Sequence, residues 1–534
     1  MPGRHRTQQL VTSCQHVSGA MPKPTPTARR EHHGASAVLP VVSSAFVVSN
    51  ENYYASEFSP VAVRQLGAAR FLAVSRTGDH HLLSGAELQA VERDPASLPL
   101  PLQATLKSRF LLLAKAPSPG LQRLARSLLA AKRETVQAGP SLHILVTTLH
   151  CEHSCGYCQV SRAREGAGFT MAERDLDAAC DTVFESASPT LTIEFQGGDP
   201  LLRPDLVERA VRRIHDRNRG EGRRLRFVVA STLHQLDAGL CDFLREHDVF
   251  LSTSIDGPAW LHDKNRPTPG RDSYRRTVAG IRMARERIHP DCVSALMTTT
   301  PHSLPHPEAI VDEYVQLGLQ DVFLRPLSAY GFAKRNQARL GYSLDCFDAF
   351  YQRGLDRVIE WNRRGVPIRE VYAGILLNKM LSPFDSGFVD LQSPCGAGSS
   401  VLVYNHDGHV YPSDEARMLA ATGDPSLRLG RIGEPLSTLL SSRVQRGLHA
   451  ASLTAAHPDC QRCAYQLYCA PNPVEACAAH GRPDVPPSTT EHCQRHQRLF
   501  DSMFRRLDEA DPALLDLFHR WAHPHELEAS PCAA

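Results

Sequence analysis

Short apolar segments alternate with amphipathic ones between residues 143 and 327, and this alternation is the clearest pattern in the chain. The apolar segments are HILVTTL (143–149), LTIEFQ (191–196), LRFVVAS (225–231), VFLSTSI (249–255), CVSALMTT (292–299) and DVFLRPL (321–327). Apolar runs without polar alternation are typical of parallel strands that helices cover. The first intervening helix is expected over 171–187, with Thr170 as its N-cap. Six strand–helix units predict an α/β fold, a partial (β/α)6 TIM-like barrel with its functional groups at the carboxyl ends of the strands.

Residues 71–91 show a different pattern. The segment FLAVSRTGDHHLLSGAELQAV predicts a strand, a turn at Gly78 and Asp79, a second strand and a helix that begins after Ser84. Apolar residues at helical spacing continue to about residue 138. This region is therefore expected to be a small α+β domain.

These patterns divide the chain into five parts. They are a tail (1–40), an N-terminal α+β domain (41–138), the barrel (139–335), a helical connector (336–390) and a cysteine-bearing extension that ends in two helices (391–534). The tail lacks the apolar core of a secretory signal. We expect it to be disordered, or to be an over-extended gene start with Met21 as the true initiator.

Composition excludes several kinds of partner. The formal net charge is +2, so neither nucleic acid nor a membrane surface is an expected partner. No apolar run approaches the ~18 residues of a membrane span, and the missing export signal predicts a cytoplasmic protein. Of the 15 cysteines, three lie within 151–158 and five within 460–493. Clusters of this kind, without an export signal, indicate metal ligation rather than disulfides.

Cys151, Cys155 and Cys158 follow the first predicted strand at spacings of four and three. Thiolates are the usual ligands of a cubane iron–sulfur cluster, and three of them leave one iron open to a chelating molecule. A zinc site of three cysteines and one histidine, with His150 or His153 as its fourth ligand, uses the same loop. The loop alone leaves both metals open.

The C-x3-C-x2-C spacing, the aromatic Tyr157 before the last cysteine and the position after the first strand together resemble the radical S-adenosylmethionine (SAM) superfamily. The resemblance implies a [4Fe-4S] cluster whose open iron binds SAM, and cleavage of SAM to a 5′-deoxyadenosyl radical. QGGDP (196–200) resembles the Gly-Gly-Glu-Pro turn of that family, which implies SAM contacts for Gly197, Gly198 and Asp199. Asp199 is shorter than the usual Glu.

STSIDGPAWLHDKNRP (252–267) resembles a stretch of radical SAM enzymes that modify peptides and proteins. The resemblance implies that Ser254 and Asp256 meet the ribose or carboxylate of SAM, and that Arg266 pairs with its carboxylate. Each of the three is equally suited to a turn or a surface ion pair. Ser231 and Thr232, after the third strand, are weaker candidates.

The second cysteine group resembles the SPASM extension, which carries auxiliary iron–sulfur clusters. Its motifs here are SPCGAG (393–398), NHDGHVYPSDEAR (405–417), CQRCAYQLYCAPNPVEAC (460–477) and EHC (491–493). The resemblance implies one auxiliary [4Fe-4S] cluster on Cys460, Cys463, Cys469 and Cys493. A second cluster would keep Cys395, but Ser413 and Pro473 occupy two of its ligand positions, with Cys477 as a substitute at shifted spacing. A four-cysteine zinc site satisfies the complete set equally.

One branch of the family is matched best. TLHCEHSCGYCQVSR (148–162), FLRPLSAYGFA (323–333) and YPSDEARML (411–419) most resemble the radical SAM maturases of the His-Xaa-Ser system, B-type component. The resemblance implies a ribosomally made peptide as substrate and an electron donor such as flavodoxin or ferredoxin. Similarity to sulfatase maturases implies that Asp414 acts as the substrate base.

Three functions remain open on the sequence. The first is a peptide-modifying radical SAM enzyme, in which residues 41–138 dock the peptide. The second is a sulfatase-maturase-like enzyme that oxidises one Cys or Ser of a protein partner. The third is a zinc-stabilised binding protein without enzymatic activity.

Overall fold

The computed structural model describes residues 62–112, 119–137, 139–164, 166, 168–328 and 330–523. The chain forms two compact units, one ending at Lys115 and the other beginning at Ala116. The expected tail (1–40) and the start of the N-terminal domain lie outside the described residues. Among the described helices, none combines the length and the apolar character that a membrane span requires.

The first unit contains an antiparallel sheet in the order β1-β2-β3 (Ala62–Gln65, Arg70–Val74 and His80–Ser84). Two helices follow, α2 (Gly85–Arg93) and α3 (Leu100–Ser108). Ser84 opens α2 as expected, because its hydroxyl accepts from the amide of Glu87 (3.2 Å) while the Glu87 carboxylate accepts from the amide of Ser84 (2.7 Å). The unit has its own core, formed by Ala73, Leu83, Leu88, Leu98, Leu106 and Leu111.

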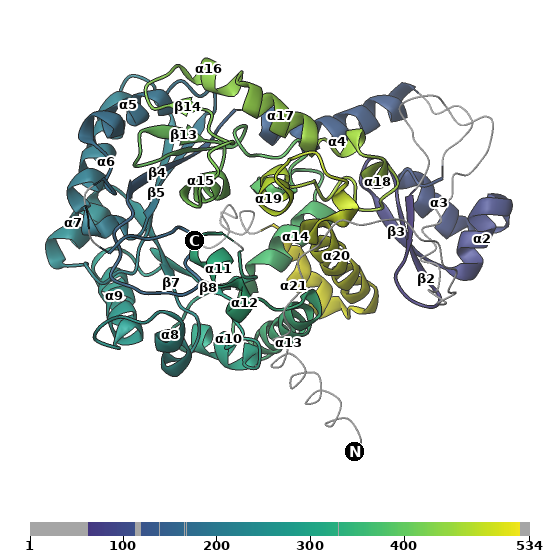
Figure 1. Ribbon diagram of the computed structural model, residues 1–534. Coiled ribbons are helices and arrows are strands. Elements are labelled where there is room, and N and C mark those ends of the chain that lie inside the picture. The colour runs from purple at the N-terminus through teal and green to yellow at the C-terminus, as the bar shows by residue number, and fades with distance from the viewer. Residues whose placement is uncertain are drawn as a thin grey trace, which may run out of the picture. The chain divides into compact units, whose positions relative to one another are not determined.

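The second unit is built on a curved sheet of parallel strands, as the alternating pattern predicted (Figure 1). Its strands are β4 (Leu142–Thr148), β5 (Thr190–Gly197), β6 (Arg224–Ala230), β7 (Val249–Ser254), β8 (Val293–Thr298), the short β9 (Asp321–Val322) and β10 (Leu324–Arg325). Six of them lie in the order β10-β8-β7-β6-β5-β4, and β9 pairs instead with β11 (Arg369–Glu370). The connecting helices are α5 (Glu173–Val183), α6 (Pro204–Asn218), α7 (Ala238–Glu246), α8 (Ala259–Asn265), α9 (Ser273–Arg287) and α10 (Pro307–Gln316).

The start of α5 corrects one expectation. Its N-cap is Ala172, not Thr170. Thr170 forms an isolated bridge with Thr148, and the two hydroxyls lie 3.2 Å apart. The helix begins at Glu173, so Thr170 lies outside the cap position.

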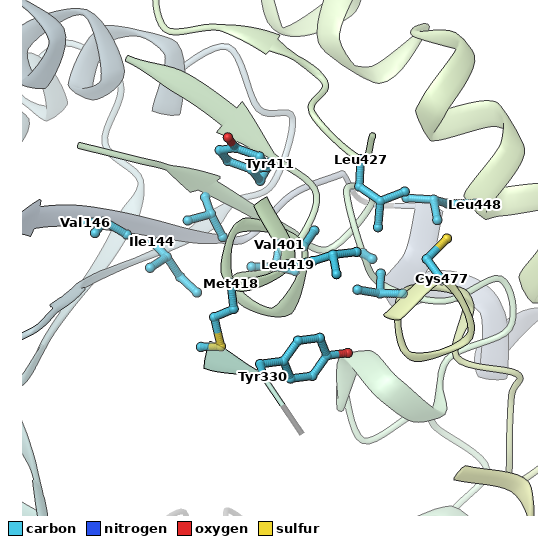
Figure 2. Close-up of a cluster of buried hydrophobic side chains, with 14 of the residues drawn as sticks. Ile144, Val146, Tyr330, Val401, Tyr411, Met418, Leu419, Leu427, Leu448 and Cys477 are labelled. Atoms are coloured by element: carbon cyan, nitrogen blue, oxygen red, sulfur yellow. The ribbon is translucent and has the colours of Figure 1, made fainter. Parts of the chain in front are cut away.

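The sheet continues into the cysteine-bearing extension, which the sequence did not predict. Strand β12 (Val401–Tyr404) pairs in parallel with β4, and β13 (His409–Tyr411) and β14 (Gly430–Arg431) follow as antiparallel strands. Helix α15 (Asp414–Ala421) covers this junction. Figure 2 shows Ile144 and Val146 of β4 in one apolar cluster with Met418 and Leu419 of α15.

The face of the sheet that α15 covers is called the inner face below. Glu194 is the register partner of Ile144, so its side chain lies on this face, because register partners of adjacent strands point the same way. Leu191, Ile193 and Phe195 alternate with it and are fully buried on the opposite face.

The second unit contains further helices. They are α4 (Pro119–Gln137), α11 (Gly331–Arg335), α12 (Gln337–Leu340), α13 (Leu344–Arg363), α14 (Val371–Leu381), α16 (Leu436–Leu440), α17 (Arg443–Ser452), α18 (Pro458–Gln461), α19 (Pro473–His480), α20 (Glu491–Glu509) and α21 (Pro512–Ala522). Helices α13 and α14 form the expected connector, and α20 and α21 are the two expected final helices.

Candidate functional site

The three-cysteine loop leaves the carboxyl end of β4 and is held by backbone hydrogen bonds. The amide of Cys151 donates to the carbonyl of Ala163 (3.1 Å), and the amide of Ser154 donates to the carbonyl of Pro267 (2.8 Å). The second bond ties the loop to the segment that follows β7. The loop therefore lies at the edge of the sheet where function was expected.

Helices α11 and α12 support the loop from another side. The backbone amide of Phe332 donates to the carbonyl of Cys158 (2.8 Å). The side-chain amide of Asn336 donates to the carbonyl of Gly156 (2.7 Å). Gly331 has φ +55°, and a Cβ there would lie 2.2 Å from the carbonyl oxygen of Gln159. Gly331 and Phe332 thus pack directly on the cysteine loop, a role that the sequence did not reveal.

The thiols of the loop lie in an environment that disfavours their charged form. Burial raises the pKa of the Cys151 thiol to about 12, and the charge of Asp199 adds to the shift. Burial also raises the pKa of Cys155. Such thiolates need a bound cation to be stable, which is what iron supplies. The donor set therefore fits an iron–sulfur cluster.

Among the described residues, no three His, Cys, Asp or Glu side chains are arranged as ligands of one metal ion. A four-iron cluster takes each thiolate on a different iron, so its ligands surround a body wider than a single ion. The lack of a single-ion site among the described residues is therefore compatible with a four-iron cluster on this loop.

The two glycines of QGGDP are required by close backbone contacts. A Cβ on Gly197, which has φ +146°, would lie 1.8 Å from the carbonyl oxygen of Thr148. A Cβ on Gly198 would lie 2.3 Å from the carbonyl oxygen of His150. The turn therefore packs against the first residues of the cysteine loop, where any side chain would displace one of them.

Asp199 is fully buried and uses its carboxylate inside the protein. It accepts from the hydroxyl of Ser231 (2.7 Å), the hydroxyl of Thr232 (2.5 Å) and the amide of Leu201 (3.1 Å). These bonds join the end of β5 to the end of β6. Ser231 and Thr232 thus contact Asp199, and the shorter acid fits this internal position.

Asp256 and Arg266, which the resemblance assigned to SAM, pair with each other. The Arg266 Nη2 donates to Asp256 Oδ1 (3.1 Å), and the amide of Thr298 donates to the same oxygen (3.1 Å). The hydroxyl of Tyr157 donates to Asp256 Oδ2 (2.5 Å), while the Arg266 guanidinium lies 5.4 Å from the Tyr157 ring centroid. Burial raises the pKa of Tyr157 well above its usual value, so the phenol stays a donor. Ser254 lies half-buried at the end of β7.

Buried histidines lie behind the cysteine loop, and sequence reasoning missed their arrangement. His153 Nε2 and His262 Nε2 both contact the hydroxyl of Ser273, at 2.6 and 2.9 Å. His153 Nδ1 lies 4.0 Å from Cys151 Sγ. Burial lowers the pKa of His153 to about 2 and that of His262 well below its usual value, so both rings are neutral. His150 instead turns toward the ring of Phe169.

Four cysteines of the second group lie near one another. Burial raises the pKa of Cys460 to about 12, and the charges of Cys463 and Cys493 add to the shift. Burial, followed by the charges of Cys493, Cys463 and Cys460, raises the pKa of Cys469 well above its usual value. Cys493 lies in the first turn of α20. The four thiols that the SPASM pattern assigned to one auxiliary cluster therefore lie within electrostatic range of one another.

Cys395 and Cys477 have different surroundings. Both belong to the apolar cluster between β4, β12 and α15, where Figure 2 shows Cys477 beside Leu448. Ser413 and Pro473, which replace two family cysteines, both serve helix starts. Ser413 is the N-cap of α15, and Pro473 is the first residue of α19.

Asp414 begins α15 and pairs with the buried Arg417 (Nη2 to Oδ1, 2.6 Å). Glu194 lies within electrostatic range of it. Burial raises the pKa of Glu194, and the charge of Asp414 adds to the shift while Arg325 opposes it. The inner face thus carries more than one carboxylate, and Glu194 was not identified from the sequence.

Comparison with known proteins agrees with this geometry. Residues 145–313 match the family model of the radical SAM superfamily. An uncharacterized protein of Synechocystis is 26% identical over 192 residues, which cover 34% of this chain and 47% of that protein. The match therefore spans about half the length of that relative. The cysteine-type anaerobic sulfatase-maturating enzyme of Clostridium perfringens is 21% identical over 387 residues, which cover 69% of this chain and 98% of the enzyme.

Two solved structures share the fold. Native anSMEcpe with bound AdoMet has a TM-score of 0.57 at 18% identity, and the match covers 69% of this chain and 98% of that one. Streptococcus suis SuiB bound to precursor peptide SuiA has a TM-score of 0.50 at 11% identity, covering 82% and 99%. The segment 145–313 that matches the radical SAM superfamily contains the three-cysteine loop and its Gly-Gly turn, both at the carboxyl ends of strands of the partial barrel.

Proposed function

We propose that this chain is a radical SAM enzyme that modifies a ribosomally made peptide, of the His-Xaa-Ser type. The observation that carries the proposal is the loop of Cys151, Cys155 and Cys158, packed between the Gly-Gly turn and α11 at the carboxyl end of the barrel. These three thiolates would hold a [4Fe-4S] cluster with one iron open to SAM. When bound, the cluster and SAM supply the radical chemistry that removes a hydrogen atom from a substrate.

The protein's own groups surround that position. Gly197 and Gly198 bring their backbone against the loop, and Ser254 ends the neighbouring β7. Asp256 and Arg266 hold the loop through Tyr157. We assign them to loop positioning as well as to the SAM pocket.

Asp414 is our candidate base. It starts α15 on the inner face of the sheet, and Arg417 fixes its carboxylate. A carboxylate held in one orientation can accept a proton from a substrate as that substrate is oxidised. Cys460, Cys463, Cys469 and Cys493 would hold an auxiliary cluster.

The first unit is our candidate for peptide docking. Its sheet has β1 and β3 as outer strands, and an outer strand can accept an extended peptide as an added strand. The SuiB structure contains a bound precursor peptide, which supports a peptide partner here. A cytoplasmic flavodoxin or ferredoxin would supply electrons.

Sulfatase-maturase-like oxidation of a Cys or Ser is the second candidate. The match to the Clostridium perfringens enzyme along 69% of this chain favours it, as does Asp414. The two functions are separated by offering anaerobically reconstituted protein, SAM and reductant two peptides. One carries His-Xaa-Ser repeats, and the other carries a sulfatase site with Cys or Ser.

Mass spectrometry should find a changed mass only in the His-Xaa-Ser peptide. Modification of the sulfatase peptide alone would reverse the assignment. Zinc in place of iron and acid-labile sulfide would support the zinc-stabilised binding protein and end the radical proposal.

A further inference from the structure

We propose that His153 is a positioning residue that tunes the cluster by donating an N–H···S hydrogen bond to Cys151. The required tautomer of His153 is imposed by a chain of hydrogen bonds that starts at the backbone amide of Asp256. This inference rests on the proposed function, because it assumes a cluster on the 151–158 loop. It assigns to His153 an effect on the reduction potential of the cluster, which the spacing of the cysteines does not indicate.

The chain of hydrogen bonds begins at a backbone amide, which has a single hydrogen-bonding role. The backbone N–H of Asp256 can only donate, and it points to Nδ1 of His262 at 3.3 Å. Nδ1 of His262 is therefore an acceptor, so in the neutral ring the hydrogen is on Nε2. That Nε2 lies 2.9 Å from the hydroxyl oxygen of Ser273 and donates to it.

The hydroxyl of Ser273 continues the same order of donor and acceptor toward His153. Its oxygen accepts from His262, and its hydrogen points to Nε2 of His153, 2.6 Å away. This Nε2 is then an acceptor, so the ring hydrogen of His153 is on Nδ1. Nδ1 is the atom that faces Cys151 Sγ at 4.0 Å, the outer limit for a hydrogen bond to sulfur.

Burial makes this order of donors and acceptors stable. Ser273 and His262 have no exposed surface, and His153 is 3% exposed. Water is therefore a poor competitor for these groups, and each polar atom keeps its partner in the chain. His234 packs on His153 with ring centroids 4.9 Å apart, which restricts rotation of the ring.

A donor aimed at a ligand sulfur changes the energy of the reduced cluster. Reduction adds negative charge that spreads onto the thiolates, and a hydrogen bond to one of them stabilises that charge. The bond therefore raises the reduction potential. His153 would make the cluster easier to reduce than the three thiolates alone would.

Two substitutions separate the hydrogen bond from simple packing. Asparagine places its amide N–H near the position of Nδ1, whereas glutamine places it near Nε2. His153→Asn should keep the donor to Cys151, and His153→Gln should keep the contact with Ser273 but lose that donor. His150→Gln is the control, because His150 lies in the same loop and contacts Phe169 instead.

The measurement is an EPR-monitored redox titration of the cluster without SAM, in protein whose auxiliary ligand Cys469 is replaced by Ala. At a fixed potential, His153→Gln should lower the ratio of reduced to oxidised cluster at least tenfold, a shift of about 59 mV for one electron. His153→Asn and His150→Gln should stay near the parent value. Equal reduction potentials in the parent and the three variants would overturn the inference. An equal decrease in potential for His153→Asn and His153→Gln would also overturn it.

A spectroscopic test does not depend on the variants folding. In otherwise native protein labelled with histidine that carries 15N at Nδ1 alone, the reduced cluster should show a 15N coupling in pulsed EPR. Its absence would overturn the inference while leaving the proposed function intact. Protein that assembles no iron–sulfur cluster on the 151–158 loop would overturn both.

Discussion

Asp414 and Arg417 form an ion pair of 2.6 Å across the first turn of α15, on the inner face of the barrel sheet. Arg417 is 2% exposed, and its Nε also donates to Asp414 Oδ1 (2.7 Å). The ion pair therefore orients Asp414, the residue to which the family resemblance assigned the role of substrate base. The geometry makes that role open to a direct test.

Asp414→Asn should keep a hydrogen bond to Arg417 but remove the proton acceptor. We expect formation of modified peptide to fall about 100-fold or more, while 5′-deoxyadenosine is still formed. Both products are measured by mass spectrometry in the same reaction. Glu415→Gln is the matched variant, because it neutralises the adjacent acid of the same helix. Loss of product in Glu415→Gln alone would assign the base to Glu415.

Gly331→Ala should damage the cysteine loop. The new Cβ would lie 2.2 Å from the carbonyl oxygen of Gln159 and 2.7 Å from that of Cys158, so the loop must move. We expect loss of most of the iron bound at 151–158. Gly481→Ala is the control, since Gly481 also has positive φ (+73°) but no atom within 4 Å of the added Cβ. That variant should cost about 1 kcal/mol and keep its iron, and equal iron loss in both would refute the clash argument.

The auxiliary site can be examined once the first cluster is removed. A protein with Cys151, Cys155 and Cys158 all replaced by Ala should retain about four irons and equal acid-labile sulfide. Further replacement of Cys469 should remove them. About eight irons in the triple variant would show that Cys395 and Cys477 support a second auxiliary cluster. Zinc in the triple variant would rule out a redox role for the Cys460 set.

Deletion of the first unit should separate docking from chemistry. A chain that begins at Ala116 keeps the whole second unit, so SAM cleavage without substrate should persist. We expect binding of the precursor peptide to weaken at least tenfold, about 1.4 kcal/mol. Fluorescence anisotropy of labelled peptide measures this loss, and retained iron content verifies folding. Unchanged affinity would assign docking to the second unit.

Asp390 should make stability depend on pH. Burial, with the charges of Glu415 and Glu475, raises its pKa to about 7, whereas an unfolded chain titrates aspartate near 3.9. The folded state binds this proton more tightly, so the stabilisation is complete below about pH 4 and is lost as pH rises through about 7. Asp390→Asn keeps the bond from Asn472 (3.2 Å) and cannot ionise.

Thermal unfolding between pH 4 and 8 tests this sign. The Asp390→Asn variant should match the parent near pH 4, gain on it as the pH rises toward 7, and keep a constant advantage in midpoint above pH 7. Because both proteins share all other titrating groups, the difference isolates Asp390. A difference that does not change with pH would show that this carboxyl is already ionised.

The long elements and the cysteine loop were predictable, since each carries a local signal. Strand β5 was predictable from its apolar run, and the start of α2 from Ser84 three residues before Glu87. The partners of these groups were not predictable. Asp256 was expected at SAM, but its bond to Tyr157 joins positions 99 residues apart and leaves no trace in either segment.

The extension strands were missed for a related reason. β13 and β14 have three and two residues, too few to show a period, and β12 has four apolar residues within a Gly-rich segment. The role of Gly331 was missed because only the three-dimensional path of the Cys158 loop creates its clash. Ser413 and Pro473 also carry the local signal of helix starts, since a Ser N-cap and a Pro in the first turn both favour a helix N-terminus.

The parallel pairing of β4 with β12 has a consequence for biosynthesis. Strand β4 ends at Thr148, and its partner begins at Val401, so β4 is synthesised more than 250 residues earlier. At about 5–20 residues per second, this edge of the nascent sheet waits roughly 10–50 s for its neighbour. A bare apolar edge is prone to pair with other chains. Ribosomal products that stop before the extension should therefore aggregate or occupy chaperones, although they contain every strand of the barrel itself.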